Sequence, residues 1–306
     1  MPTWPEPLER AYAACEAFAR SHYENFPVAS RLLPRAIRPH VAAIYAFARV
    51  ADDIADEGSL PASERRSRLE AWRRRLHGAL TVERLSEPPT DHEDLIVAAL
   101  AHSIRTRDLP IELFDDLLSA FEQDTMTTRY ASWAEVFDYC RRSANPIGRL
   151  VLRVAGYRGG AIERSSDALC TALQLTNFWQ DFGRDWRAGR LYVPRDLQTA
   201  CGAREEELGH VPLNRNITET PGMSPSWVRA LEECVHVTRE QYAAGRDVCD
   251  RVSGRMRYEL RCTWIGGHRI LERIERARRD LLSYRPTIGF ADLPSIAWQA
   301  ARWART

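Results

Sequence analysis

Two stretches of the sequence place acidic side chains on one face of a predicted helix. In the stretch Val41–Glu57, the residues Tyr45, Arg49, Asp52 and Asp56 fall within about 60° of one another on a helix that turns about 100° per residue. A phenol, a guanidinium and two carboxylates therefore share one stripe, called here the first stripe. The residues between them are mostly apolar, and carboxylates beside an apolar surface are costly unless they are paired or bind a cation.

A second stripe consists of Gln174, Asn177, Asp181 and Asp185, again at helical spacing among apolar neighbours. Two such stripes facing each other across a bundle would offer oxygen ligands to divalent cations. Mg²⁺ suits best, because it takes one or two carboxylates and completes its shell with water and phosphate oxygens. Arg49 would then hold a diphosphate through paired N–H donors. The alternative, for either stripe alone, is a solvated helix face or a surface ion pair.

The composition excludes several classes of function. All 43 residues counted as Lys or Arg are arginine, which excludes chemistry that needs a lysine amine, such as a P-loop, a kinase ATP site or a Schiff base. The net charge of +1 argues against a nucleic-acid-binding protein, so no nucleic acid partner is expected. The seven cysteines lack C-x-x-C spacing, and neither a secretory signal nor a membrane-spanning apolar run is evident. These features predict a cytoplasmic protein with reduced thiols.

Helices must carry these stripes, because Ala, Leu, Arg and Glu dominate the long segments and alternating β-branched runs are nearly absent. The pattern predicts helices over residues 8–20, 39–57, 62–80, 91–106, 110–123, 132–155, 163–185, 225–252, 255–282 and 292–303. The proline- and glycine-containing stretch 202–226 is predicted to be an irregular loop. Without a repeat or a dividing linker, we expect a single all-α domain over residues 1–306.

Both stripes, in this order, resemble the squalene/phytoene synthase family. The motifs are Tyr45-x-x-x-Arg49-x-x-Asp52-Asp53-x-x-Asp56-Glu57 and Gln174-x-x-Asn177-x-x-x-Asp181-x-x-x-Asp185, and the likeness extends from about Ala11 to about Arg285. The resemblance implies an isoprenoid synthase fold, which is a helical bundle with a central apolar cavity. It also implies Mg²⁺-dependent diphosphate chemistry on a lipid diphosphate substrate.

The family also implies roles for matching positions. The implied metal ligands are Asp52, Asp56, Asn177, Asp181 and Asp185. Arg49 would contact the diphosphate, and Tyr45 and Gln174 would face the reacting carbons. The expected substrate-binding residues are Glu24, Phe26, Tyr139, Phe178 and Arg190.

Within the family, the segments His22–Ser30 and Asn177–Trp186 look like the bacterial branch that forms hydroxysqualene for hopanoids. That activity converts presqualene diphosphate to hydroxysqualene. In the segment Tyr139–Gly148, Ser143 and Asn145 put polar groups where condensing members carry an apolar wall. Either could hold the water that captures the cation, and Glu24 could take its proton. In the plainer interpretation, Ser143 packs between helices, Asn145 caps the break before the next proline, and Glu24 pairs with an arginine.

Two other functions stay open at this point. One is a head-to-head prenyl transferase that condenses two farnesyl diphosphates, and the other is a non-catalytic helical scaffold. For the hydroxysqualene branch, the pathway neighbours would be a presqualene diphosphate synthase and a hydroxysqualene reductase. The stretch Phe290–Arg305 would either lie on the inner face of the membrane, as a peripheral contact, or pack on the bundle through Ile296 and Trp303.

Overall fold

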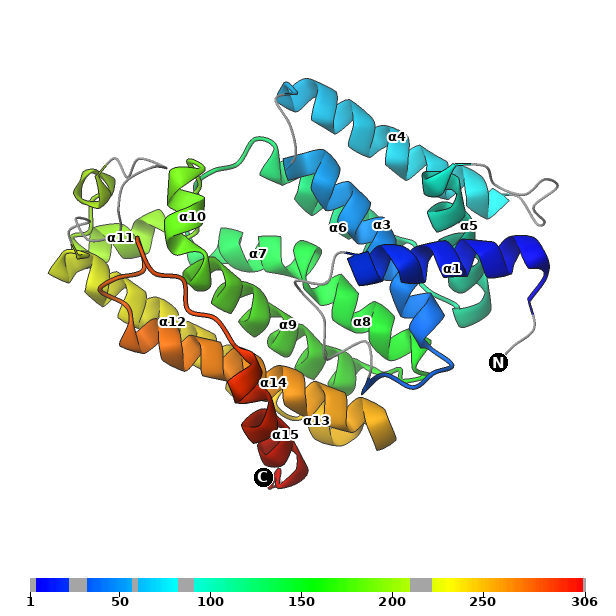
Figure 1. Cartoon of the computed structure of the whole chain (residues 1–306). Coiled ribbons are helices and arrows are strands. Elements are labelled where there is room, and N and C mark those ends of the chain that lie inside the picture. Colours follow the sequence, from blue (N-terminus) through cyan, green and yellow to red (C-terminus); the bar gives the residue numbers. More distant parts are fainter. Residues whose placement is uncertain (1–3, 22–31, 57–59, 82–90, 210–221, 305–306) are drawn as a thin grey trace. The chain divides into compact units, whose positions relative to one another are not determined.

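The computed structural model describes residues 4–21, 32–56, 60–81, 91–209 and 222–304 (Figure 1). Helices dominate these residues, and the pairing of extended backbone among them is an isolated bridge between Arg129 and Leu191. The prediction of an all-α fold is therefore confirmed. No helix in the described ranges has the length and apolar character needed to cross a bilayer.

The chain forms two compact units. The first unit contains Met1–Met126, Pro146–Glu163 and Val252–Glu259, and the second contains Thr127–Asn145, Arg164–Arg251 and Leu260–Thr306. That residues 1–306 form a single domain stays a prediction.

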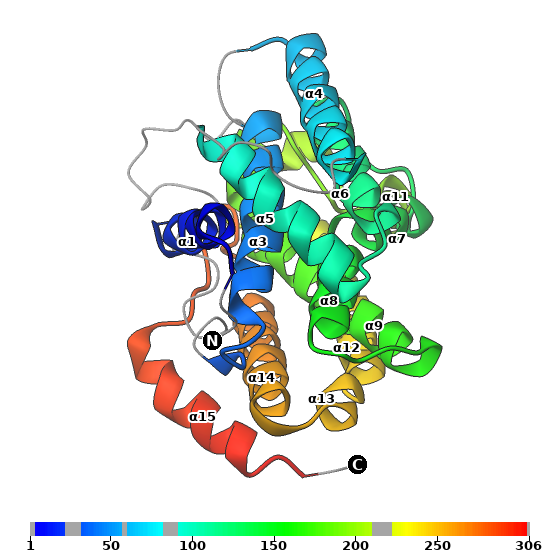
Figure 2. The same ribbon diagram turned by 90° about the vertical axis from the view of Figure 1, so that its right-hand side faces the viewer.

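The first unit is built around the helix that carries the first stripe. Its helices are α1 (Glu6–Ser21), α3 (Arg38–Asp56), α4 (Ala62–Thr81), α5 (His92–Arg107), α6 (Glu112–Asp124) and most of α8 (Asn145–Val154). Helix α3 packs against α1, α4, α5 and α6, as Figure 2 shows for α1 and α5. Phe47 of α3 is fully buried, and its ring contacts those of Trp72 and Phe114. This apolar face holds α3 in place and leaves Arg49 and Asp52 half-buried.

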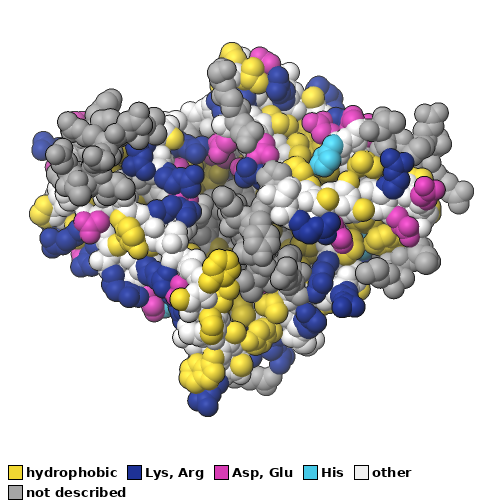
Figure 3. Space-filling view, in the orientation of Figure 1, with side chains coloured by type: hydrophobic (Ala, Val, Ile, Leu, Met, Phe, Trp, Pro, Cys, Tyr) yellow, Lys and Arg dark blue, Asp and Glu magenta, His cyan; other side chains and the backbone are white. Residues whose placement is uncertain are grey.

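The second unit contains the second stripe. Its elements are α7 (Trp133–Ser143), α9 (Gly160–Gln180), α10 (Phe182–Arg187), α11 (Arg195–Cys201), η1 (Glu205–Leu208), α12 (Pro225–Gly245), α13 (Val248–Arg251), α14 (Gly254–Arg276), η3 (Phe290–Asp292) and α15 (Leu293–Ala301), with the first residues of α9 and α14 assigned to the first unit. Buried polar contacts join α9 to α12, where Trp179 Nε1 donates to Thr238 Oγ1 over 2.9 Å. Trp264 of α14 donates to the Tyr242 carbonyl of α12 over 3.0 Å. Figure 3 shows hydrophobic side chains gathered over α15.

Several predicted helices are interrupted or end earlier than predicted. The helix predicted over 132–155 is two helices, because Pro146 has no N–H and its ring clashes with the preceding turn. The helix predicted over 225–252 is interrupted after Gly245, and that over 255–282 ends at Arg276. Within 202–226, η1 and the start of α12 are helical, while residues 210–221 lie outside the described ranges.

Candidate active site

The first stripe is held together by Arg49. Its Nη1 lies 3.0 Å from Asp52 Oδ2, and its Nη2 lies 2.7 Å from Asp53 Oδ1. The third donor, Nε–H, is buried and has no hydrogen-bond acceptor. One guanidinium thus pairs with two carboxylates and still has a donor for another anion. Sequence reasoning placed Asp53 in the motif but did not assign it a role.

Two other members of the first stripe differ in burial. Tyr45 is half-buried, and burial raises the pKa of its phenol, while the nearby Arg49 opposes this shift and Asp53 and Asp52 add to it. Asp56 is exposed at the last turn of α3. The stripe therefore runs from a neutral phenol, through a paired guanidinium, to an accessible carboxylate.

The second stripe crosses the junction between α9 and α10. The predicted helix over 163–185 is wrong at Asp181, which separates the two helices with φ −92° and ψ 10°. The backbone nevertheless continues the helical hydrogen bonds, from Asp181 N to Asn177 O and from Asp185 N to Asp181 O, both over 2.9 Å. The predicted spacing of these three residues is thus kept across the junction.

A chain segment beyond α14 supports this junction. The Gln180 amide donates to the Pro286 carbonyl over 2.6 Å. Gly183 approaches the backbone so closely that an added Cβ would lie 2.3 Å from the Leu282 carbonyl oxygen. Only glycine allows this contact, so α10 and its Asp185 are positioned by the segment around Leu282.

Arginines also pair with the carboxylates of the second stripe. Arg285 donates to both oxygens of Asp181, with Nη2 3.2 Å from Oδ2, and Arg184 lies 3.5 Å from Oδ1. Arg190 Nη2 lies 3.5 Å from Asp185 Oδ1. The two aspartate side chains are only 16% and 15% exposed, so these cations offset much of the cost of burying them.

The donor set fits Mg²⁺ bound together with a phosphate ligand. Each stripe supplies carboxylate oxygens, which hard divalent cations prefer. Among the described residues no group of three or more His, Cys, Asp and Glu could hold a metal ion. Mg²⁺ takes few protein ligands and completes its shell with water and phosphate oxygens.

Aromatic rings gather beside the second stripe. The Phe178 ring stacks on that of Tyr192 at 3.7 Å, and the Tyr139 ring lies 5.9 Å from Phe178. The Tyr130 ring also stacks on that of Tyr192, with centroids 5.5 Å apart. All four residues are buried. The structure thus brings together the predicted pair Tyr139 and Phe178, and it adds Tyr130 and Tyr192, which sequence reasoning missed although Tyr192 lies two residues from Arg190.

Ser143 and Asn145 flank the break between α7 and α8. Asn145 is 8% exposed, and its Oδ1 accepts a hydrogen bond from Thr171 Oγ1 over 3.0 Å. Ser143 Oγ is buried with no hydrogen-bond partner. Buried hydroxyls are normally hydrogen-bonded, so Ser143 Oγ keeps its capacity to donate to or accept from a further polar group. One helical turn earlier, Tyr139 belongs to the aromatic group described above.

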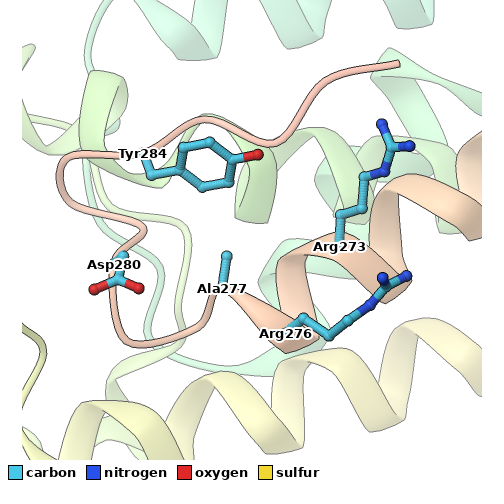
Figure 4. A pocket seen from close by; sticks show the side chains of 5 residues that line it. All are labelled: Arg273, Arg276, Ala277, Asp280 and Tyr284. Atoms are coloured by element: carbon cyan, nitrogen blue, oxygen red, sulfur yellow. The ribbon is translucent and has the colours of Figure 1, made fainter. Parts of the chain in front are cut away.

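The two amides of the second stripe, Gln174 and Asn177, differ in exposure. Gln174 is half-buried on α9, and Asn177 is exposed one turn later. Glu24 and Phe26 lie outside the described residues. A surface hollow in the second unit is lined by Arg273, Arg276, Ala277, Asp280 and Tyr284 (Figure 4). None of the predicted site residues lines it, so it is distinct from the candidate active site. The central apolar cavity stays a prediction.

Comparison with known proteins identifies the family. A family model described as squalene/phytoene synthase matches residues 19–292. The hydroxysqualene synthase of Zymomonas mobilis is 42% identical over 201 residues, covering 63% of this chain and 64% of that protein. The hydroxysqualene synthase of Rhodopseudomonas palustris is 39% identical over 187 residues, covering 61% of this chain and 60% of that protein. The match thus spans somewhat less than two thirds of these relatives.

A phytoene synthase is also similar, and so are solved structures. The phytoene synthase of Mycobacterium tuberculosis is 34% identical over 197 residues, covering 64% of this chain and 62% of that protein. The squalene synthase HpnC from Alicyclobacillus acidocaldarius has a TM-score of 0.77 at 34% identity, covering 89% of this chain and 96% of that chain. A dehydrosqualene synthase has the same fold, with a TM-score of 0.77 at 18% identity, covering 97% of this chain and 99% of that chain. With the family model matching residues 19–292, this chain belongs to the squalene/phytoene synthase family.

Proposed function

We propose that this protein converts presqualene diphosphate to hydroxysqualene and releases diphosphate. Its similarity to two hydroxysqualene synthases, at 42% and 39% identity, supports this branch of the family. The structural observation that carries the proposal is the buried, unpartnered Ser143 hydroxyl, which lies two residues before the buried Asn145. A reaction that ends in water capture needs such polar groups, whereas a condensation that excludes water does not.

Diphosphate binding is assigned to the two stripes. Asp52, Asp56, Asn177, Asp181 and Asp185 would hold Mg²⁺, which neutralises the diphosphate and makes it a better leaving group. Arg49 would donate its unused Nε–H to the diphosphate as negative charge builds on the bridging oxygen. Arg190 lies 3.5 Å from Asp185 Oδ1, so its guanidinium would provide a second positive charge near the diphosphate.

Loss of diphosphate breaks a carbon–oxygen bond and leaves a cyclopropylcarbinyl cation, which rearranges. The rings of Tyr139 and Phe178 would line its path, excluding bulk water and stabilising the cation through their faces. Tyr45 and Gln174 would face the reacting carbons. Phe26 is assigned to the same wall.

Water capture completes the reaction. A water held by Ser143 Oγ and the Asn145 amide forms the new carbon–oxygen bond with its lone pair, and its proton passes to Glu24, the predicted base. One presqualene diphosphate and one water thus give one alcohol and one diphosphate, without a reductant. In a pathway, a presqualene diphosphate synthase would supply the substrate and a hydroxysqualene reductase would consume the product.

The test offers purified protein and Mg²⁺ either presqualene diphosphate or farnesyl diphosphate, in isotopically labelled water, with products read by mass spectrometry. We expect consumption of presqualene diphosphate alone and an alcohol that carries the label. Consumption of farnesyl diphosphate would instead favour the condensing transferase, which the 34% identity to a phytoene synthase keeps as the second candidate. No turnover of either substrate, with the helical fold intact, would favour the scaffold.

A further inference from the structure

Exposed aromatic side chains concentrate in the C-terminal part of the second unit. Four large hydrophobic side chains are exposed within the described ranges, and three of them, Tyr284, Phe290 and Trp298, lie within fifteen residues of one another. Phe290 is 90% exposed and Trp298 is 59% exposed. Figure 3 shows the hydrophobic surface over α15 to which this segment contributes. A concentration of exposed rings indicates an interaction surface more strongly than scattered apolar residues do.

The backbone beneath these rings is firmly attached. Ile296 and Ala300, on the other face of α15, are buried. The Trp303 ring lies under the Arg246 guanidinium, 4.1 Å from its centroid, and its Nε1 donates to Asp250 over 3.2 Å. The prediction that Ile296 and Trp303 pack on the bundle is therefore supported by their contacts. The same anchoring fixes Trp298 on the outward face.

The start of the segment is anchored as well. Asp292 accepts a hydrogen bond from the Gly289 backbone over 2.9 Å and pairs with Arg269 and Arg273. This carboxylate is therefore neutralised, and the turn that carries Phe290 is held in place. The exposure of Phe290 follows from a fixed turn and not from a loose end.

The outward face of α15 that carries Trp298 also carries the positive charge of Arg302. The Arg302 guanidinium lies 4.7 Å from the centre of the Trp298 ring. Among the described residues no carboxylate pairs with Arg302, whereas Asp292, the acid of the same segment, is already paired. Aromatic rings beside an arginine are typical of side chains that lie at a boundary between lipid and water.

The size of the face argues against a stable dimer of this chain. Fully buried aromatic side chains contribute about 150–250 Å² each, so the partly exposed rings of Phe290 and Trp298 offer roughly 300 Å². A stable protein interface needs about 800 Å² from each partner. A lipid surface has no such requirement, because a few inserted rings and one charge give reversible binding.

We propose that the face formed by Phe290, Trp298 and Arg302 lies on an anionic lipid bilayer. The rings insert at the level of the headgroups, and the guanidinium contacts lipid phosphate. This inference does not depend on which prenyl diphosphate the protein uses. It would place a water-insoluble substrate or product close to the membrane that dissolves it.

The test is co-sedimentation of the full chain with vesicles of phosphatidylcholine, with and without phosphatidylglycerol. We expect wild type to bind the anionic vesicles, and the double variant Phe290→Ser, Trp298→Ser to bind them roughly tenfold more weakly. Arg302→Gln should weaken binding about fivefold on anionic vesicles and leave binding to neutral ones unchanged. The matched control is Met126→Ser, because Met126 is as exposed as Trp298 but belongs to the first unit.

Each contrary outcome overturns the proposal. Equal binding by the double variant and wild type would mean that these rings do not touch lipid. An equal loss in Met126→Ser would show unspecific adsorption. If light scattering showed a wild-type dimer that the double variant converts to a monomer, the face would be an interface between copies. Circular dichroism and turnover of detergent-dispersed substrate should match wild type in all variants, which confirms that each is folded.

Discussion

Arg49 is the positively charged residue of the first stripe. It pairs with Asp52 and Asp53 through its two terminal nitrogens, while Nε–H has no acceptor. A lysine carries the same charge but lacks the planar fork, so it cannot serve both carboxylates and an anion at once. We expect Arg49→Lys to lower turnover roughly 100-fold with unchanged helix content, measured by steady-state assay and circular dichroism.

The control for that substitution is Arg68→Lys. Arg68 also pairs with a carboxylate on its own helix, Glu64, at 3.1 Å, but both side chains are exposed. Exposed pairs of this kind contribute little, so turnover should not change. Near-wild-type turnover in Arg49→Lys would remove Arg49 from the active site.

Asn145 is the residue whose replacement should change the product and not merely the rate. Asn145→Ala removes the amide that we propose holds the water together with the Ser143 hydroxyl, so water should capture the cation less often. We expect the alcohol to fall as a share of the products, while alkene products from proton loss increase, as measured by mass spectrometry. Thr171→Val should have a smaller effect in the same direction, because Thr171 orients the amide.

Thr176→Val is the matched control, since Thr176 is buried on the same helix but bonds to Tyr242 over 3.0 Å. It should leave the product ratio unchanged. An unchanged ratio in Asn145→Ala would exclude Asn145 from positioning the water.

Periodicity predicted the local partners at the site but not the distant ones. Tyr45, Arg49 and Asp52 lie within two turns of one helix, so their common face follows from the helix repeat. Arg285 and Asp181 are separated by 104 residues, and no local pattern relates them. Their pairing depends on how the chain returns after α14, which is a property of the tertiary fold.

At the scale of elements, helix identity was predictable and helix ends were less so. The predicted helix over 39–57 agrees with α3, Arg38–Asp56, because its apolar stripe packs on four other helices. The break at Asp181 was not predicted, because neither proline nor glycine marks it. Two residues after the break, Gly183 packs closely against the segment around Leu282, a contact that the local sequence does not indicate.

Those contacts make Gly183 a test of how α10 is positioned. An added methyl at Gly183 would lie 2.3 Å and 2.7 Å from two backbone carbonyl oxygens, so α10 must move to admit it. We expect Gly183→Ala to cost about 1–3 kcal/mol of unfolding free energy and to lower turnover, as measured by urea denaturation and assay. Gly78→Ala is the control, because nothing lies within 4 Å of an added methyl there. It should stabilise α4 by about 0.5–1 kcal/mol; equal behaviour of the two variants would contradict the assigned contact.

A buried polar cluster attaches α1 to α3 and α5 and should respond to pH. The Tyr12 hydroxyl lies 2.8 Å from His102 Nδ1, 3.1 Å from His40 Nδ1 and 2.9 Å from Ser103 Oγ. The pKa of His40 is lowered to about 4, mainly by burial and in addition by Arg107 and His102. Burial likewise lowers the pKa of His102, with help from Arg105 and Arg107. The cluster is therefore built for neutral imidazoles.

These lowered pKa values determine how the free energy of unfolding changes with pH. As pH falls below about 6.5, the unfolded chain takes up protons that folded His40 does not accept until about pH 4, so unfolding becomes easier. We expect the free energy of unfolding to fall by about 2 kcal/mol between pH 7 and pH 4.5 because of this residue. His40→Gln should reduce that pH dependence in urea titrations. A slope identical to wild type would contradict the assignment.

At the scale of the whole molecule, the two stripes belong to different compact units. The family assignment covers residues 19–292 and therefore includes both. Helical spacing in the sequence predicted both stripes, because each is a local pattern. That both stripes bind the same diphosphate is part of the proposed function, and ligand binding can test it directly.

Ligand-dependent stability provides that test. A ligand that binds only the folded chain raises its stability by about 3 kcal/mol at 100 times the dissociation constant, which raises the melting temperature by roughly 5 °C for a chain of this size. We expect this shift with Mg²⁺ and inorganic diphosphate together, a smaller one with either alone, and none with excess chelator. If one ligand engages both stripes, Asp52→Asn and Asp181→Asn should each abolish the shift, and the double variant should lose no more than either single variant. Independent partial losses that add in the double variant would instead mean that each stripe binds its own ligand, and the shared diphosphate would have to be abandoned.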